Sequence, residues 1–146
     1  MSATRVTASA AAALAVGTVL HRVALPAVSR TQLVYYCAAA RVTDPIHYDR
    51  EAARAAGFND VVVNGSLRIA WLTQALADLV AAPDFVSSLR AAHRGPMLAG
   101  QTLSLVVRVA APVIDQGAAL LLPCEVIGTV DDQVVDQAEG VLTLLR

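Results

Sequence analysis

The pattern of hydrophobic and polar residues changes once along the chain, near residue 83. Before this point apolar residues recur mainly at helical spacing, and after it they alternate with polar residues as they do in β-strands. The strongest helical pattern covers residues 66–82. Its apolar residues take up so much of the circumference that we expect this helix to be buried on most sides. One side carries Ile69, Leu72, Leu76, Leu79 and Val80.

Two shorter helices are predicted upstream from their capping residues. The segment Ser29–Gln32 has the spacing of a capping box, which predicts a helix over residues 29–41. Pro45 interrupts any continuation, because the residue before a proline favours an extended conformation. Asp49 is placed to cap a second helix, over residues 50–56.

The second half of the chain predicts an antiparallel sheet. Residues 20–28 add an edge strand, because Pro26 removes a backbone donor that an edge can spare. Pro123 indicates a bulge or an edge by the same argument. One long helix against such a sheet is an α+β architecture, in which the sheet wraps around the helix. The four strands that alternation predicts cover residues 85–93, 102–111, 118–130 and 133–145.

The length of 146 residues and the lack of a linker predict a single domain over residues 1–146. Residues 1–12 are rich in Ser, Thr and Ala, and we expect them to be poorly ordered. Hydrophobic residues make up 56% of the chain, which is more than one small core can hide. A second subunit is therefore expected to cover part of the surface.

Composition argues against several classes of function. The eleven basic residues are scattered and the net charge is −1, which argues against nucleic-acid binding. The two cysteines show no C-x-x-C pairing, so we expect no metal site, no disulfide and a cytoplasmic location. No apolar run reaches the roughly 20 residues of a membrane span. No cofactor is expected.

Three segments carry the residue pattern of a known family. They are D-P-I-H-Y-D-R-E-A-A-R-A-A-G-F from Asp44, V-V-V-N-G from Val61 and P-M-L-A-G-Q-T-L from Pro96. Together they resemble the MaoC-like hydratases, the (R)-specific enoyl-CoA hydratase branch of the hotdog fold. The resemblance extends from about Leu14 to Leu145. It implies a hotdog fold, with an antiparallel sheet wrapped around a long buried central helix, and an acyl-thioester substrate.

The hydratase motif of this family, Asp-x-Asn-Pro-Leu-His, contains a catalytic Asp and a catalytic His. Position by position, His47 matches the catalytic histidine, but Val42 occupies the position of the catalytic aspartate. Valine can neither accept nor donate a proton, so the implied site is incomplete. Asp44 is the candidate substitute, although it lies three residues before His47 instead of five.

The resemblance also implies a site for the negative charge that develops on the thioester oxygen. The backbone N–H of Gly65, at the start of the long helix, is the candidate donor, because the helix dipole favours negative charge there. A glycine would let the thioester approach the backbone closely. The plainer alternative is a turn glycine before a helix.

Three further residues are candidates for substrate binding, each with a plainer alternative. Asn64 either contributes to the pocket or only forms part of a turn. Trp71 either lines an acyl pocket or fills space against the sheet. Arg94 either contacts a CoA phosphate or is a solvated surface residue. His21 and His93 lack a comparable context, and we interpret both as surface or sheet-edge residues.

Three functions are compatible with these residues. The first is hydration or dehydration of an enoyl thioester, on CoA or an acyl carrier, by a homodimer or heterodimer of hotdog chains. The second is a catalytically degenerate hotdog subunit that pairs with an active MaoC-like partner. The third is a hotdog enzyme for isomerisation, cyclisation or thioester hydrolysis. Hydrolysis is disfavoured, because hotdog thioesterases generally need a carboxylate near the central helix and Asp78 lies at its far end.

Overall fold

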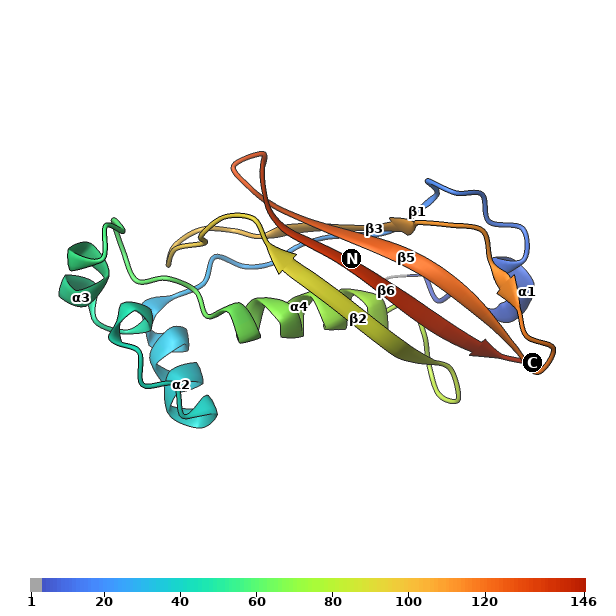
Figure 1. Ribbon diagram of the computed structural model, residues 1–146, viewed down its shortest axis with the longest axis horizontal. Coiled ribbons are helices and arrows are strands. Elements are labelled where there is room, and N and C mark those ends of the chain that lie inside the picture. Colours follow the sequence, from blue (N-terminus) through green and yellow to red (C-terminus); the bar gives the residue numbers. More distant parts are fainter. Residues whose placement is uncertain (1–3) are drawn as a thin grey trace.

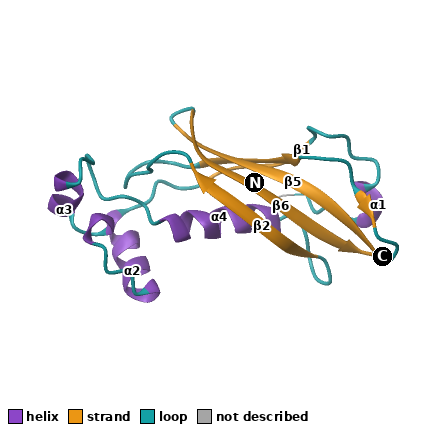
Figure 2. Ribbon diagram, viewed as in Figure 1, coloured by secondary structure: helices purple, strands orange, loops and turns teal. Residues whose placement is uncertain are grey.

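A long helix, α4, lies along one face of an antiparallel sheet, and two shorter helices lie beyond one end of that sheet (Figure 1, Figure 2). The structure is a computed structural model, and it describes residues 4–146. Helix α4 spans Gly65–Ala77 and contacts the strands β2, β3 and β6. This arrangement confirms the α+β prediction of a sheet packed against a long helix.

The shorter helices begin at the capping residues that the sequence indicates. The Ser29 hydroxyl accepts a hydrogen bond from the Gln32 N–H at 3.1 Å. The Asp49 carboxylate caps the next helix by accepting the N–H of Ala52 at 3.1 Å. Between them lies a 3-10 turn that the pattern does not predict. The elements are α1 (Ala8–Ala11), α2 (Arg30–Ala40), η1 (Pro45–His47) and α3 (Arg50–Ala55).

Hydrogen-bonded neighbours in the sheet follow the order β1-β3-β5-β6-β2, and β4 pairs with β5 beside this path. Strand β1 is an edge, as the sequence predicts. The turn between β5 and β6 places Asp131 and Asp132 at φ values of 48° and 63°. The strands are β1 (Val19–Ala24), β2 (Phe85–His93), β3 (Ser104–Val109), β4 (Ile114–Asp115), β5 (Ala119–Val130) and β6 (Gln133–Leu145).

The prediction that Pro123 marks a bulge or an edge is wrong. Pro123 pairs with Val141 in regular register, and its strand lies between two others. Its other side faces the gap where β3 has ended and β4 has not yet begun. The Ala110 N–H donates to the Pro123 carbonyl there at 2.9 Å. Because no neighbouring strand needs a donor from this position, the sheet tolerates a proline in an inner strand.

The core lies between α4 and the inward faces of the strands. In β3 the buried residues are Leu105 and Val107, with Val109, as alternation predicts. On β6, Gly140 lets the helix approach the sheet closely. A Cβ atom at Gly140 would overlap Leu76 of α4. The helix and the sheet are therefore in direct contact at this point.

Helix α4 is less enclosed than its sequence predicts. Leu72, Leu76 and Leu79 are fully buried, but Ile69 is 41% exposed. Arg68 is buried although it is charged. The sheet thus covers one side of the helix, and that side includes an arginine near the helix start. Within residues 4–146, no helix is both long and apolar enough to cross a membrane.

The expectation of poor order over residues 1–12 stays a prediction. Residues 1–3 lie outside the described part of the chain. Residues 4–12 pack on the rest of the protein, with Val6 and Ala11 buried. The Val6 N–H donates to the Leu79 carbonyl at 2.8 Å, just beyond the end of α4. Burial of these two small apolar side chains contributes to the packing of this segment.

Candidate active site

The ring of His47 is held by a single backbone carbonyl. Val62 donates its N–H to the Ile46 carbonyl at 2.9 Å, and the His47 Nδ1 lies 2.7 Å from the Val62 carbonyl oxygen. A carbonyl oxygen can only accept a hydrogen bond, so Nδ1 carries the hydrogen. The neutral ring then has its lone pair on Nε2. His47 is half-buried, and it is oriented as a base with Nε2 available.

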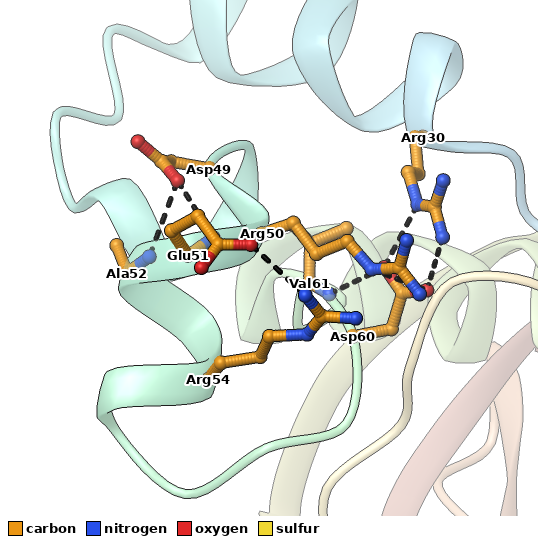
Figure 3. A network of polar contacts seen from close by, with 8 residues as sticks. All are labelled: Arg30, Asp49, Arg50, Glu51, Ala52, Arg54, Asp60 and Val61. Carbon is orange, nitrogen blue, oxygen red and sulfur yellow. Dashed lines mark hydrogen bonds and ion pairs between the residues drawn. The ribbon is translucent and has the colours of Figure 1, made fainter.

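The segment that holds His47 is anchored by Asp60 (Figure 3). Asp60 Oδ1 accepts the Val61 N–H at 2.8 Å and the Arg30 Nε–H at 2.8 Å, and Arg30 Nη2 pairs with the other carboxylate oxygen. Arg50 Nε of α3 lies 3.8 Å from the same carboxylate. The hydrogen bond from Arg30 holds the pKa of Asp60 well below its usual range. Asp60 therefore ties α2 and α3 to the strand-like run that contains Val62.

Asp44 serves as a local cap. Its Oδ1 accepts the Ile46 N–H at 3.2 Å at the start of η1, and the residue is exposed. Within the described residues, its carboxylate makes no hydrogen bond to the His47 ring. Val42 is half-buried, and its N–H donates to the Cys37 carbonyl at 2.9 Å. The role of Asp44 as the partner of His47 stays a prediction.

The N-terminus of α4 lacks a cap from the residue that precedes it. Asn64 is 2% exposed, and its amide faces the Cys37 sulfur at 3.6 Å. Of the described residues that precede a helix, Asn64 differs from Ser29 and Asp49 in making no side-chain hydrogen bond to its own helix. The first-turn N–H groups of α4 are thus left without this acceptor, as an oxyanion site requires.

A buried charged cluster lies beside this helix start. Arg68 donates from Nε to Asp136 Oδ2 at 3.0 Å and from Nη2 to Oδ1 at 2.8 Å. His93 Nδ1 lies 2.6 Å from the same Oδ1. The Asp136 side chain is 0% exposed and that of His93 is 33% exposed. Arg68 also donates to the carbonyls of Val135 and Gly95, at 2.6 and 3.0 Å.

Two glycines make room for this cluster. A Cβ on Gly65 would lie 2.9 Å from the His93 Nε2, and a Cβ on Gly128 would lie 2.9 Å from the Asp136 Cβ. Both distances are too short for any real side chain. The space beside Gly65 that was assigned to an approaching thioester is therefore taken by His93. The backbone N–H of Gly65, which points along the helix, stays a candidate donor.

The interpretation of His93 as a surface or sheet-edge residue is incomplete. His93 does end the edge strand β2, but its ring faces the buried Asp136 on β6. The alternation of inward- and outward-facing residues along β6 could have indicated a buried partner for His93. Asp136 shares its inward-facing parity with four buried residues, so a carboxylate stands where the pattern calls for an apolar side chain. These four are Ala138, Gly140, Leu142 and Leu144.

The other predicted substrate-binding residues lie in different environments. Trp71 is half-buried and packs against the core. Arg94 is exposed, and its Nε and Nη2 lie 3.3 and 3.2 Å from the Gln137 Oε1. Among residues 4–146, no group of three or more His, Cys, Asp or Glu side chains is arranged to hold a metal ion.

A hollow lies elsewhere, on the sheet. It has a volume of about 740 Å³ and is lined mainly by β2, β3, β5 and β6. Its charged residues, which include Arg108 and Glu125, have the outward-facing parity of their strands. His47, Gly65 and His93 are not among its lining residues. The hydrogen-bonded side chains of the candidate site are therefore separate from this hollow.

Comparison with known proteins places this arrangement in a family. A family model described as MaoC like domain matches residues 10–118, and the chain belongs to the MaoC-like family. The structure is similar to the (R)-hydratase from A. caviae involved in PHA biosynthesis, with a TM-score of 0.77 and 17% identity over 90% of this chain and 98% of that chain. No curated protein matches the sequence.

Two protein complexes from Mycobacterium tuberculosis contain similar chains. One is the ChsH1-ChsH2 complex, with a TM-score of 0.76 and 24% identity over 90% of this chain and 98% of that chain. The other is the C-terminally truncated HadBC (3R-hydroxyacyl-ACP dehydratase) complex, with a TM-score of 0.68 and 21% identity over 83% and 90%. These similarities confirm the hotdog fold that the sequence predicts.

The Asp60 anchor predicts a pH-dependent stability. Because the pKa of Asp60 is lowered below the unfolded value of about 3.9, its carboxylate stabilises the folded state above about pH 4. This contribution is lost as the pH falls towards the folded pKa. Asp60→Asn should therefore lower the urea midpoint at pH 7, and the difference from the wild-type protein should shrink between about pH 4 and pH 2.

Circular dichroism at each pH measures both midpoints. Asp132→Asn, in the exposed β5–β6 turn, is the matched control and should leave the midpoint unchanged. A difference between the wild-type protein and Asp60→Asn that stays constant over the whole pH range would show that the Arg30–Asp60 pair is not its source.

Proposed function

We propose that this protein is an enoyl-thioester hydratase or dehydratase of the MaoC-like type, acting on an acyl chain carried by CoA or by a carrier protein. The observation that carries the proposal is the 2.7 Å contact between His47 Nδ1 and the Val62 carbonyl, which leaves Nε2 free for proton transfer. Membership of the MaoC-like family supports it. The similarity to an (R)-hydratase is consistent with the same reaction class.

The chemistry assigns a separate task to each group. In the hydration direction, His47 Nε2 takes a proton from water, and the water oxygen bonds to the β-carbon of the enoyl thioester. The electrons of the double bond move onto the thioester oxygen. The N–H of Gly65 would stabilise that charge, since the start of α4 has no cap from Asn64 and favours anions. A second group must then give a proton to the α-carbon.

Substrate binding is assigned to residues around the same helix start. Asn64 would form part of the wall behind Gly65, because it is buried one residue upstream. Trp71 would line the acyl chain on the next turns of α4, and the exposed Arg94 would contact a CoA or carrier phosphate. Asp44 would assist His47 if its carboxylate gave up the hydrogen bond from the Ile46 N–H and bonded to the His47 ring instead.

The assembly and location belong to the same proposal. We propose a cytoplasmic dimer, either of two copies or with another hotdog chain. The support is the apolar composition, together with exposed apolar residues such as Ile69 of α4 and Phe85 at the start of the edge strand β2.

His47→Gln should reduce kcat for hydration of trans-2-enoyl-CoA by about 10²–10⁴-fold, because the amide cannot accept the water proton. The loss of ultraviolet absorbance of the conjugated thioester measures the rate. His21→Gln is the matched control. The His21 Nε2 lies 4.0 Å from the Asp78 Oδ2. Asp78 follows the last residue of α4, about 20 Å from Gly65 along the helix.

Two results would contradict the proposal. One is a wild-type protein that hydrates no enoyl thioester over a range of chain lengths, on CoA or on a carrier protein. The other is full activity in His47→Gln. Mass spectrometry of the products separates hydration from isomerisation, cyclisation and thioester hydrolysis, which are the remaining chemistries for this fold.

A second candidate is a subunit that depends on a MaoC-like partner for its carboxylate. The observation that favours it is Val42, an apolar residue at the position of the family's catalytic Asp. The two similar complexes from Mycobacterium tuberculosis, ChsH1-ChsH2 and HadBC, are consistent with paired chains of this fold. In this case the isolated chain would be inactive and would co-purify with its partner.

Val42→Asp distinguishes the two candidates. The leading proposal predicts that the isolated wild-type chain is active and that the substitution changes kcat by less than about threefold. The paired-subunit candidate predicts an inactive chain whose rate rises at least tenfold above background, because the carboxylate is restored. Val42→Asn is the control for both candidates, because asparagine has the size of aspartate without its charge.

A further inference from the structure

The cluster of Arg68, Asp136 and His93 contains a third side chain that a buried ion pair does not need. Each carboxylate oxygen of Asp136 already accepts a hydrogen bond from Arg68, and these two charged side chains are 4% and 0% exposed. The pair is therefore satisfied without a third member. His93 adds a further contact to Oδ1, at 2.6 Å, from a side chain that is one-third exposed. Of the three side chains, that of His93 is therefore the most accessible to solvent.

The contact with Asp136 fixes the orientation of His93. An ionised carboxylate can only accept, so Nδ1 of His93 carries a hydrogen and Nε2 points away from Asp136. Nε2 then lies beside Gly65, 2.9 Å from the position that a Cβ on that residue would take. Gly128, opposite Asp136 on β5, is kept free of a side chain by the same cluster.

His93 and His47 are both tied to one short stretch of backbone. His47 Nδ1 contacts the Val62 carbonyl, and His93 Nε2 adjoins Gly65, three residues later. Three residues span at most about 11 Å. The two rings present the same chemistry, with Nδ1 engaged by an acceptor and Nε2 available. They come from different elements, η1 and β2.

We propose that His93 is the second acid–base residue of this site, with Asp136 and Arg68 as its positioning residues. The proposal rests on the proposed hydratase function and supplies the proton donor that Val42 cannot provide. The N–H of Gly65 would bind the thioester oxygen, and the α-carbon lies one bond beyond the thioester carbonyl carbon. His93, which adjoins Gly65, is therefore assigned to the α-carbon, and His47 to the water at the β-carbon.

The protons balance over one turnover. In hydration, neutral His47 takes a proton from water at Nε2 while the C–O bond forms at the β-carbon. The imidazolium of His93 gives its Nε2 proton to the α-carbon as the thioester carbonyl re-forms. His47 ends protonated and His93 neutral, and exchange with solvent returns both to their starting states. Dehydration begins from the opposite pair of states and runs in reverse.

His93→Asn is the decisive variant. The asparagine amide nitrogen occupies nearly the position of Nδ1, so it can still donate to Asp136, but it cannot transfer a proton at the position of Nε2. We expect kcat for enoyl-CoA hydration to fall about 10²–10⁴-fold, with the thermal midpoint and the affinity for a saturated acyl-CoA nearly unchanged. A merely structural histidine would tolerate this substitution.

His93→Ala provides an independent readout. It leaves space for an external base, so added imidazole should restore activity in a saturable manner. His21→Ala is the matched control, and imidazole should have no effect on it. Both measurements use the wild-type protein in parallel, and thermal melting checks that each variant is folded.

The outcomes separate this inference from the function on which it rests. Activity in the wild-type protein, its loss in both His93 variants and rescue of His93→Ala by imidazole support the assignment. More than about a third of wild-type kcat in His93→Asn, with His47→Gln inactive, would overturn the role of His93 and leave the hydratase proposal standing. A wild-type protein with no hydratase activity would remove both.

Discussion

The start of helix α4 is held against the sheet by one buried ion pair, Arg68 with Asp136. Both charges are almost completely removed from water, so each depends on the other, and Arg68 depends also on the carbonyls of Gly95 and Val135. Removal of one member of such a pair typically costs about 3–5 kcal/mol, because an uncompensated charge stays buried. The placement of Gly65, one turn before Arg68, follows from this pair.

The position of the first turn of α4 determines where the neighbouring histidine side chains lie. The strand-like run from Asp60 leads directly into the helix, and its Val62 carbonyl orients His47. At the other end of this run, Asp60 is tied to α2 and α3 by arginines. A shift of the helix start would therefore alter the position of both histidine rings. A Cβ on Gly65 would lie 2.9 Å from the His93 Nε2, so a side chain has no space at this position.

Much of the fold was predictable because its signals are local. Caps such as Ser29 and Asp49 act within three residues, and alternation marks each strand independently of its neighbours. The prediction for Pro123 is wrong because the tolerance for a proline depends on where two other strands begin and end. The packing of residues 4–12 depends on an acceptor near residue 79, which no local pattern reveals.

The candidate site was only half predictable, for the same reason. The motif around His47 is contiguous in the sequence, and the carbonyl that orients it lies only fifteen residues away. Arg68, His93 and Asp136 come from three separate elements, and only the folded sheet brings them together. The alternation along β6 was the one available indication of this cluster, since it places Asp136 among inward-facing apolar residues. A carboxylate at such a position indicates a buried partner.

The central claim is that two histidines present Nε2 to one thioester at the start of α4. Nuclear magnetic resonance of the protein with ¹⁵N-labelled histidine, alone and with a panel of saturated acyl-CoA thioesters, tests it most directly. The account predicts that the neutral rings of His47 and His93 both carry the proton on Nδ1, and that both Nε2 signals shift when a thioester binds. A proton on Nε2 in either neutral ring, or a bound thioester that leaves the His93 signal unchanged, would contradict it.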